Sequence, residues 1–256
     1  MIYRRMTWQE LGDVDWAHTV ALVPTGAMEQ HGPHLPVDTD TLIVTRLAEE
    51  AEQRSPERVL LTPTVWLGHS PHHLSFGGTL SLFHPSYIQM LIGICRSLVG
   101  MGARRICLLN GHGGNRAPLA IALQELKNEC RDTLVVSAEY WGLASAAINA
   151  ARESGFGGLG HACELETSLY LYLNEPEVRK DRICDDGAGW PDDSFFRSEM
   201  MHGSAASRVM NFDELTRSGV YGRPTLATAR KGETLFTAIS DRIERFLQEV
   251  NAIGTE

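Results

Sequence analysis

Short apolar runs alternate with longer segments of helical periodicity along most of this chain. The runs have the length of buried strands, and the segments between them repeat apolar residues at the spacing of an amphipathic helix. Alternating β and α units of this length predict an α/β fold, namely a three-layer α/β/α sandwich with a largely parallel sheet. We expect strands at 19–24, 58–62, 105–109 and 133–138, helices at 40–54, 85–101, 117–130, 163–173 and about 231–250, and the least regular part at 174–230.

Length and charge narrow the possible classes of function. A chain of 256 residues can bury one substantial core, so we expect residues 1–256 to form a single domain. The formal net charge of −9 argues against nucleic acid as a partner, and no apolar run approaches the roughly 20 residues of a membrane span. The N-terminus lacks the apolar block of a signal peptide. The five cysteines are scattered without a Cys-x-x-Cys pair, which favours reduced thiols and a cytoplasmic protein.

The densest set of potential metal ligands follows the first expected strand. Its loop, residues 24–40, is rich in Gly and Pro. Oxygen and nitrogen donors in such a loop at a strand end favour a hydrolytic zinc, manganese or magnesium centre over a structural site. The simpler alternative is that the aspartates only cap the following helix. The candidates are Glu29, His31, His34, Asp38 and Asp40.

The third expected strand runs into a second loop, Asn-Gly-His-Gly-Gly-Asn at residues 110–115. Its glycines allow a sharp turn and a close backbone approach, and they present His112 at the sheet edge that also carries the first loop. Phosphate binding at a Gly-rich turn is the alternative. However, the chain has neither G-x-x-x-x-G-K-[ST] nor G-x-G-x-x-G.

A third cluster opens the helix expected at 163–173. Glu164 and Glu166 are two residues apart, so on a helix they point about 200° apart and cannot both face one metal ion. If the helix has begun by His161, then His161 and Glu164 share a face. Otherwise His161 lies in the preceding loop, and Glu166 projects from the first turn. Position in the sequence does not choose between the two carboxylates.

Four motifs resemble, in order and spacing, those of the creatininase family. They are Gly-Ala-Met-Glu-Gln-His-Gly-Pro-His-Leu-Pro at 26–36 with Asp-Thr-Asp at 38–40, the loop at 110–115, His-Ala-Cys-Glu-Leu-Glu-Thr-Ser at 161–168, and Ala-Arg-Lys-Gly-Glu at 229–233. The resemblance spans nearly the whole chain. It implies a three-layer α/β/α fold, assembly as a homohexamer, and a two-metal site that hydrolyses C–N bonds outside ordinary peptides.

The resemblance also implies roles for single residues. Asp40 matches a carboxylate that bridges two divalent metal ions, zinc and/or manganese, with iron or magnesium as further options. Two such ions can hold a bridging hydroxide and polarise a substrate carbonyl. His161 matches a histidine that contacts substrate and moves protons, and Trp141 matches a substrate-facing tryptophan. The other implied metal ligands are Glu29, His31, His112 and Glu166.

The departures from the family pattern concern the substrate and one metal ligand. Creatininase has an aromatic residue and a metal-binding acid where this chain has Gly113 and Gly114, and a tryptophan over the substrate where it has Gly157. Glu164 is therefore a candidate substitute in the catalytic set. Loss of one wall of a small apolar cage weakens recognition of creatinine, so we expect a metal-dependent amidohydrolase with another small-molecule substrate. Creatininase activity itself, a metal-binding scaffold, and a non-catalytic sugar- or nucleotide-binding protein are the alternatives.

The histidines between the second strand and the second helix remain open to several interpretations. His69, His72 and His73 lie in an irregular stretch, and they are compatible with pocket lining, a surface position or a weak metal site. The residues that we expect to contact substrate are Trp141, His69, His73, Gly113 and Asn115.

Overall fold

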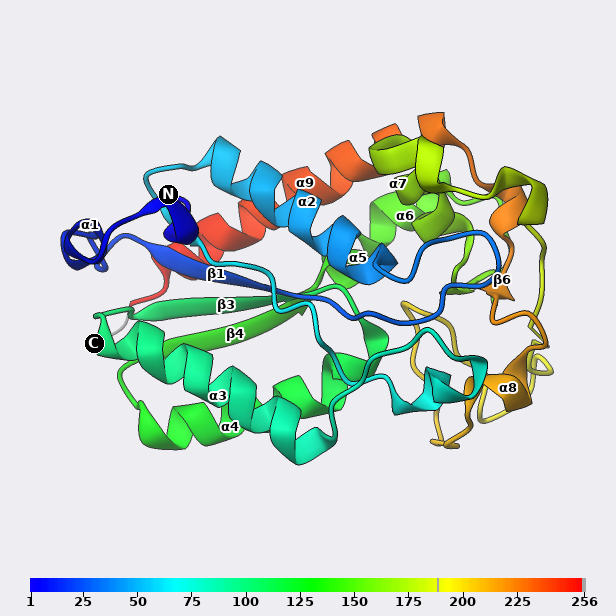
Figure 1. Cartoon of the computed structure of the whole chain (residues 1–256), viewed down its shortest axis with the longest axis horizontal. Helices are drawn as coiled ribbons and strands as arrows, with labels where there is room; N and C mark the ends of the chain where they lie inside the picture. Colours follow the sequence, from blue (N-terminus) through cyan, green and yellow to red (C-terminus); the bar gives the residue numbers. More distant parts are fainter. Residues whose placement is uncertain (188, 255–256) are drawn as a thin grey trace.

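Within residues 1–187 and 189–254, which the computed structural model describes, four strands form a parallel sheet in the order β2-β1-β3-β4 (Figure 1). Residue 188 and the last two residues of the expected 1–256 domain lie outside the described part. The strands are β1 (Val20–Thr25), β2 (Val59–Leu61), β3 (Arg105–Asn110) and β4 (Leu134–Glu139).

Successive side chains of β1 pack on opposite faces of the sheet, as the geometry of a strand requires. Val20 and Leu22 belong to one hydrophobic cluster, and Ala21 and Val23 belong to another. All four are at most 1% exposed. Burial on both faces explains why the strand is a continuous apolar run in the sequence and not an alternating one.

Helices cover both faces of this sheet (Figure 1), which confirms the expected three-layer α/β/α sandwich. The longer helices begin and end within two residues of the expected positions. One face carries α2 (Thr39–Arg54), α5 (Tyr140–Leu143), α6 (Ser145–Ala151), α7 (Glu164–Asn174) and α9 (Ala229–Ala252), and the other carries α3 (His84–Gly100) and α4 (Arg116–Glu129).

The stretches expected to be irregular contain short elements. A 3-10 turn, η2 (Pro71–Phe76), precedes α3, and the 174–230 segment contributes α8 (Phe212–Leu215) and β6 (Tyr221–Gly222). Strand β6 pairs antiparallel with β5 (Leu159–His161), so His161 ends a strand and does not begin a helix. No helix among the described residues is long and apolar enough to span a bilayer. The other short helices and turns are η1 (Tyr3–Arg5), α1 (Trp8–Gly12), η3 (Gly113–Asn115), η4 (Glu175–Glu177), η5 (Lys180–Arg182) and η6 (Pro224–Leu226).

The carboxyl ends of three strands lie side by side. Thr25 at the end of β1 pairs with Asn110 at the end of β3, which in turn pairs with Glu139 at the end of β4. The loops that follow these strands therefore start from one edge of the sheet. This is the edge at which parallel α/β sheets bind their ligands.

Helices α7 and α9 approach each other closely because α9 has a glycine at the contact. A Cβ atom at Gly232 would lie 1.9 Å from the carbonyl oxygen of Ser168 in α7. That distance is far below van der Waals contact, so no side chain fits without moving one helix. The close contact matters for the site because α7 carries Glu166.

We expect Gly232→Ala to lower the free energy of unfolding by about 1–3 kcal/mol, because the added methyl group separates α7 from α9. Gly93→Ala is the matched control, since a Cβ at Gly93 in α3 meets no described residue within 4 Å. The control substitution should raise the free energy of unfolding by about 0.5–1 kcal/mol through its better helix propensity. Urea denaturation compares the two variants, and equal stability would contradict the close packing.

Candidate metal centre

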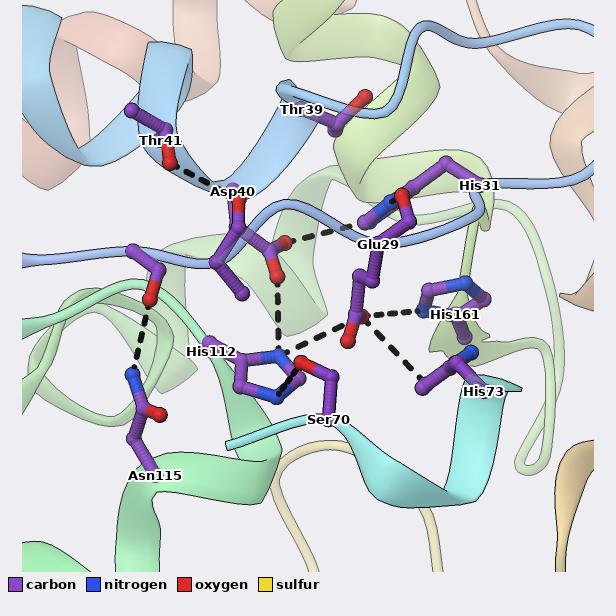
Figure 2. Close-up of polar contacts among 12 residues, drawn as sticks. Glu29, His31, Thr39, Asp40, Thr41, Ser70, His73, His112, Asn115 and His161 are labelled. Carbon is purple, nitrogen blue, oxygen red and sulfur yellow. Dashed lines mark hydrogen bonds and ion pairs between the residues drawn. The ribbon is translucent and has the colours of Figure 1, made fainter. Parts of the chain in front are cut away.

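Glu29, in the loop after β1, is surrounded by imidazoles (Figure 2). Its Oε1 atom lies 3.4 Å from His73 Nε2, 3.3 Å from His112 Nδ1 and 3.5 Å from His161 Nδ1. The side chain is 1% exposed. Four segments far apart in the sequence thus meet at one buried carboxylate.

Asp40, in the first turn of α2, contacts two of the histidines with different oxygens. Its Oδ1 lies 3.2 Å from His31 Nε2, and its Oδ2 lies 2.9 Å from His112 Nδ1. Asp40 therefore lies between His31 on one side and His112 on the other. A carboxylate in this position has the geometry of a bridge between two neighbouring cations.

Glu166 joins the cluster from the first turn of α7. Its Oε2 accepts a hydrogen bond from the backbone N–H of Cys163 at 3.2 Å, which directs the carboxylate toward the sheet edge. Three sets of side chains place one ligand atom each within 4.8 Å of one another. They are Glu29 with His31 and His161, Glu29 with His72 and His112, and His31 with Asp40 and Glu166.

Several buried polar atoms in this cluster have no partner with hydrogen-bond geometry among residues 1–187 and 189–254, even where an ion-pair distance is short. They are Glu29 Oε2, His31 Nε2 and Asp40 Oδ2. Buried polar atoms are nearly always satisfied in folded proteins, and exceptions call for a missing partner. Unpaired carboxylate oxygens and imidazole nitrogens are the donors that zinc and manganese take. The residues present therefore fit a divalent metal centre.

The charges of the cluster shift the proton equilibria strongly. Burial alone lowers the pKa of His31, but the carboxylates of Asp40, Glu166 and Glu29 outweigh burial and raise that pKa to about 9. Burial, reinforced by the charge of Asp40 and opposed by His31, raises the pKa of Glu166 to about 7. Burial likewise lowers the pKa of His112, yet Glu29 and Asp40 raise it well above its usual value. Without a cation, protons balance the charge of the carboxylates.

Backbone carbonyls fix which nitrogen of each imidazole faces the cluster. His112 Nε2 donates to the carbonyl of His69 at 3.1 Å, and His161 Nε2 donates to the carbonyl of Gln30 at 2.7 Å. The Nδ1 atoms of both rings are therefore free to face Glu29. The Gln30 side chain donates to His73 Nδ1 at 2.8 Å, which orients the third ring. Such outer hydrogen bonds are typical of metal-ligating histidines.

A cavity of about 170 Å³ opens beside the cluster. The indole of Trp141 lines it, and the buried Nε1–H of that ring has no acceptor among the described residues. Phe212 of α8 covers the histidines, with its ring centroid 3.9 Å from that of His73 and 4.8 Å from that of His161. The cavity combines a polar floor with apolar walls and an unused donor, so it suits a small polar molecule. Further lining residues are Gly113, Gly114, Arg116 and Met200.

The structure corrects the expectation that Glu164 replaces the missing acid. Its carboxylate oxygens accept hydrogen bonds from the backbone N–H groups of Glu153 and Ser154, each at 2.9 Å, and pair with Lys231 of α9. Glu164 therefore ties α7 to α9 and to the segment after α6. Helical geometry turns it away from Glu166, as the spacing of the two carboxylates requires.

Two expected substrate contacts lie behind the cavity and do not line it. Asn115 is fully buried, donates to the carbonyl of Gly26 at 3.0 Å and accepts from the backbone N–H of His69 at 3.0 Å. The ring of His69 is bound through Nδ1 to the carbonyl of Leu82 at 2.9 Å. Both residues position the loops, whereas Trp141, His73 and Gly113 do line the cavity.

Two candidate metal ligands of the first loop, His34 and Asp38, contact α7 instead of the cluster. His34 Nε2 lies 2.9 Å from the hydroxyl of Thr167, and Asp38 accepts a hydrogen bond from Tyr170 at 3.0 Å. Both partners belong to α7, so this part of the first loop attaches α7 to α2. Sequence patterns gave no sign of Met200 and Phe212, because they come from the irregular segment. Gln30 belongs to the first motif, but the sequence did not indicate that it orients the histidines.

The fold and the donor set define an α/β protein that gathers carboxylates and imidazoles at the carboxyl edge of a parallel sheet, as metal-dependent hydrolases do. The profile of the creatininase family, described as creatinine amidohydrolase, matches residues 4–247. A mycofactocin precursor peptide peptidase of Mycobacterium tuberculosis (strain ATCC 25618 / H37Rv) is 32% identical over 247 residues, which cover 91% of this chain and 88% of the relative. The chain belongs to the creatininase family.

Solved creatininases have the same fold. The structure of manganese creatininase gives a TM-score of 0.79 at 28% identity and covers 98% of this chain and 99% of that one. A mutant creatininase of zinc–zinc type gives a TM-score of 0.77 at 26% identity and covers 98% of both chains.

The proton equilibria lead to a prediction about metal uptake. Because the pKa of His31 is about 9 and that of Glu166 about 7, His31 carries a proton and Glu166 is partly protonated at pH 7. Both must lose these protons to bind a cation, so apparent affinity should rise as the pH increases from 6 to 9 (a range set by these two pKa values). Calorimetric titration with Zn²⁺ in buffers of different ionisation enthalpy measures the protons released. Uptake without proton release would contradict this account.

Proposed function

We propose that this chain is a binuclear metal-dependent hydrolase that cleaves a C–N bond other than a peptide bond in a small molecule. The observation that carries the proposal is the placement of Asp40, which directs one carboxylate oxygen at His31 and the other at His112. An amide, formamide or lactam is the bond type that such a centre attacks. The family membership of the chain supports the same reaction class.

We assign the donors to two groups that share Asp40. Glu29 and His112 would hold one ion together with Asp40, and His31 and Glu166 would hold the other together with Asp40. Carboxylate and imidazole donors favour zinc and/or manganese, and they also accept iron or magnesium. When bound, such ions lower the pKa of water and polarise a carbonyl group.

His161 is the group that we assign to proton transfer. Burial lowers the pKa of His161 well below its usual value, so the ring is neutral. Its Nε2–H is occupied by the carbonyl of Gln30, which leaves the Nδ1 lone pair facing the cavity beside Glu29. A neutral imidazole in this position accepts a proton from the attacking water and returns it to the leaving nitrogen.

The cavity argues for a substrate other than creatinine. Gly113 lines the cavity, and a Cβ atom there would meet nothing within 4 Å among the described residues, so a wall that creatininase builds with a side chain is open here. Trp141 keeps one wall and offers its indole N–H to the substrate. Because Trp141 is kept, creatininase activity is the first alternative activity to test.

An adjoining cavity favours a second candidate substrate. A space of about 250 Å³ shares Gly160, Met200 and Phe212 with the first cavity, so an elongated substrate could extend into it. The 32% identity to a mycofactocin precursor peptide peptidase of M. tuberculosis supports hydrolysis of a short peptide as this candidate. A non-catalytic sugar- or nucleotide-binding protein is the alternative outside the enzymes, and it would bind its ligand equally well without metal.

We further infer that the chain acts in the cytoplasm as a homo-oligomer, a hexamer by family resemblance. Every cysteine among the described residues is free, which supports a reducing compartment. Large apolar side chains that are exposed on the surface, including Trp66, Leu80 and Phe83, support an interface between copies.

Metal analysis is the direct test of the proposed function. Protein purified without a metal-binding tag should contain about two equivalents of zinc, manganese or iron per chain, as a two-metal hydrolase requires. Removal of metal by a chelator should abolish turnover in a screen of formamides, lactams, creatinine and short peptides, and added metal should restore it. Turnover by fully metal-free protein would contradict the mechanism, and efficient turnover of creatinine would contradict the substrate assignment.

His161→Gln should lower kcat by roughly 10²–10⁴-fold, the usual contribution of a proton-transfer group, while metal content stays at the wild-type value. His18→Gln is the control, because His18 is exposed and pairs with Asp15 alone among the described residues. Steady-state kinetics and elemental analysis of both variants provide the two readouts. Loss of metal from His161→Gln would instead make His161 a ligand, which its place beside Glu29 and His31 also allows.

A further inference from the structure

The loop that contains His112 lacks the acid that creatininase has two residues after its histidine, and Gly114 stands there. No side chain fits at this position. A Cβ atom at Gly114 would lie 2.2 Å from the carbonyl oxygen of His69, 2.4 Å from His112 Nε2 and 2.9 Å from His72 Cε1. The segment that leads into η2 therefore occupies the space that a side chain at residue 114 would take.

This close approach brings His72 to the cluster. One ring nitrogen of His72 lies within 4.8 Å of ligand atoms of both Glu29 and His112, and the three together form one of the potential ligand sets. The His72 ring is nearly parallel to that of His112, at an interplanar angle of 15° and a centroid distance of 6.0 Å. His72 also lines the cavity.

His72 differs from the other histidines of the cavity in its polar contacts. No hydrogen bond or ion pair engages either of its ring nitrogens within residues 1–187 and 189–254, and the ring is held by packing against His73 and Phe212. His73, its neighbour in η2, already accepts a hydrogen bond from Gln30 at Nδ1 and faces Glu29 with Nε2. An imidazole that is placed among metal donors with unused nitrogens is available as a ligand.

We propose that His72 is a metal ligand on the Glu29–His112 side of the centre and takes the place of the acid that Gly114 cannot supply. The assignment rests on the proposed function and makes the two sides unequal. One ion has Glu29, Asp40, His112 and His72 as protein donors, and the other has His31, Asp40 and Glu166. Gly114 and His72 depend on each other, because the absence of a side chain at 114 lets η2 approach.

The test is the affinity of the metal-depleted, full-length protein for Zn²⁺ in competition with a chelating indicator. His72→Ala removes the ring, and His72→Phe keeps a ring that can pack against Phe212 but removes both donors. Both variants should bind one of the two ions at least about tenfold more weakly, which is the lower end of what loss of an outer hydrogen-bond partner costs. His72→Glu should return the affinity toward the wild-type value, and His18→Ala should leave it unchanged.

A second readout separates ligand loss from misfolding. In Co²⁺-loaded protein, the visible absorption bands report the ligands of the ion, and His72→Phe should change them while the circular dichroism of the fold stays the same. Two ions bound by His72→Ala and His72→Phe with wild-type affinity, together with unchanged cobalt bands, would overturn this assignment and leave the proposed function intact. Failure of the wild-type protein to take up any ion would overturn both.

Discussion

Burial of three carboxylates in one small volume is the constraint on which the site depends. Glu29, Asp40 and Glu166 are between 1% and 4% exposed, and they come from the loop after β1, the first turn of α2 and the first turn of α7. Like charges in a poorly solvated interior cannot all stay ionised unless positive charge lies among them. Protons on His31 and His112 supply it here, as the raised pKa values of both rings show. Divalent cations would supply the same positive charge in a smaller volume. Metal binding would therefore also neutralise the buried carboxylates.

Three imidazoles of the cluster are each oriented by a hydrogen bond to a backbone carbonyl group. His31 Nδ1 bonds to the carbonyl of Glu29, His112 Nε2 to that of His69, and His161 Nε2 to that of Gln30. In each ring the backbone engages one nitrogen and leaves the other to face the carboxylates. The donors are therefore arranged by the loops themselves, before any ion binds, which is how precise metal sites are built. His72 has no such hydrogen bond within the described part of the chain, and its ring is positioned by packing against His73, His112 and Phe212.

The sequence was sufficient to predict the three-layer sandwich and much of the candidate metal centre, and the reason is physical. β1 and β3 are buried on both faces, so their apolar runs are continuous, and the loops after them must meet because parallel strands end at one edge. To choose which of Glu164 and Glu166 faces the cluster, one must know where α7 begins. Capping by Cys163 sets that start, and Glu164 pairs with Lys231, which is distant in the sequence. Met200 and Phe212 could not be predicted, since the segment that contains them has no periodicity. The roles of His72 and His69 depend on how closely η2 approaches Gly114, and spacing along the chain does not encode that distance.

Replacement of a carboxylate by an imidazole changes the charge of the centre as well as its shape. With His72 as the donor near Gly114, the protein would supply one negative charge fewer than with an acid there, and bound divalent ions would be less fully neutralised. Arg116 at the cavity adds little positive potential, because its guanidinium is paired with Glu139. Any excess positive charge would then lie at the metal donors and not at Arg116. Such a charge would favour substrates that develop negative charge at the scissile bond.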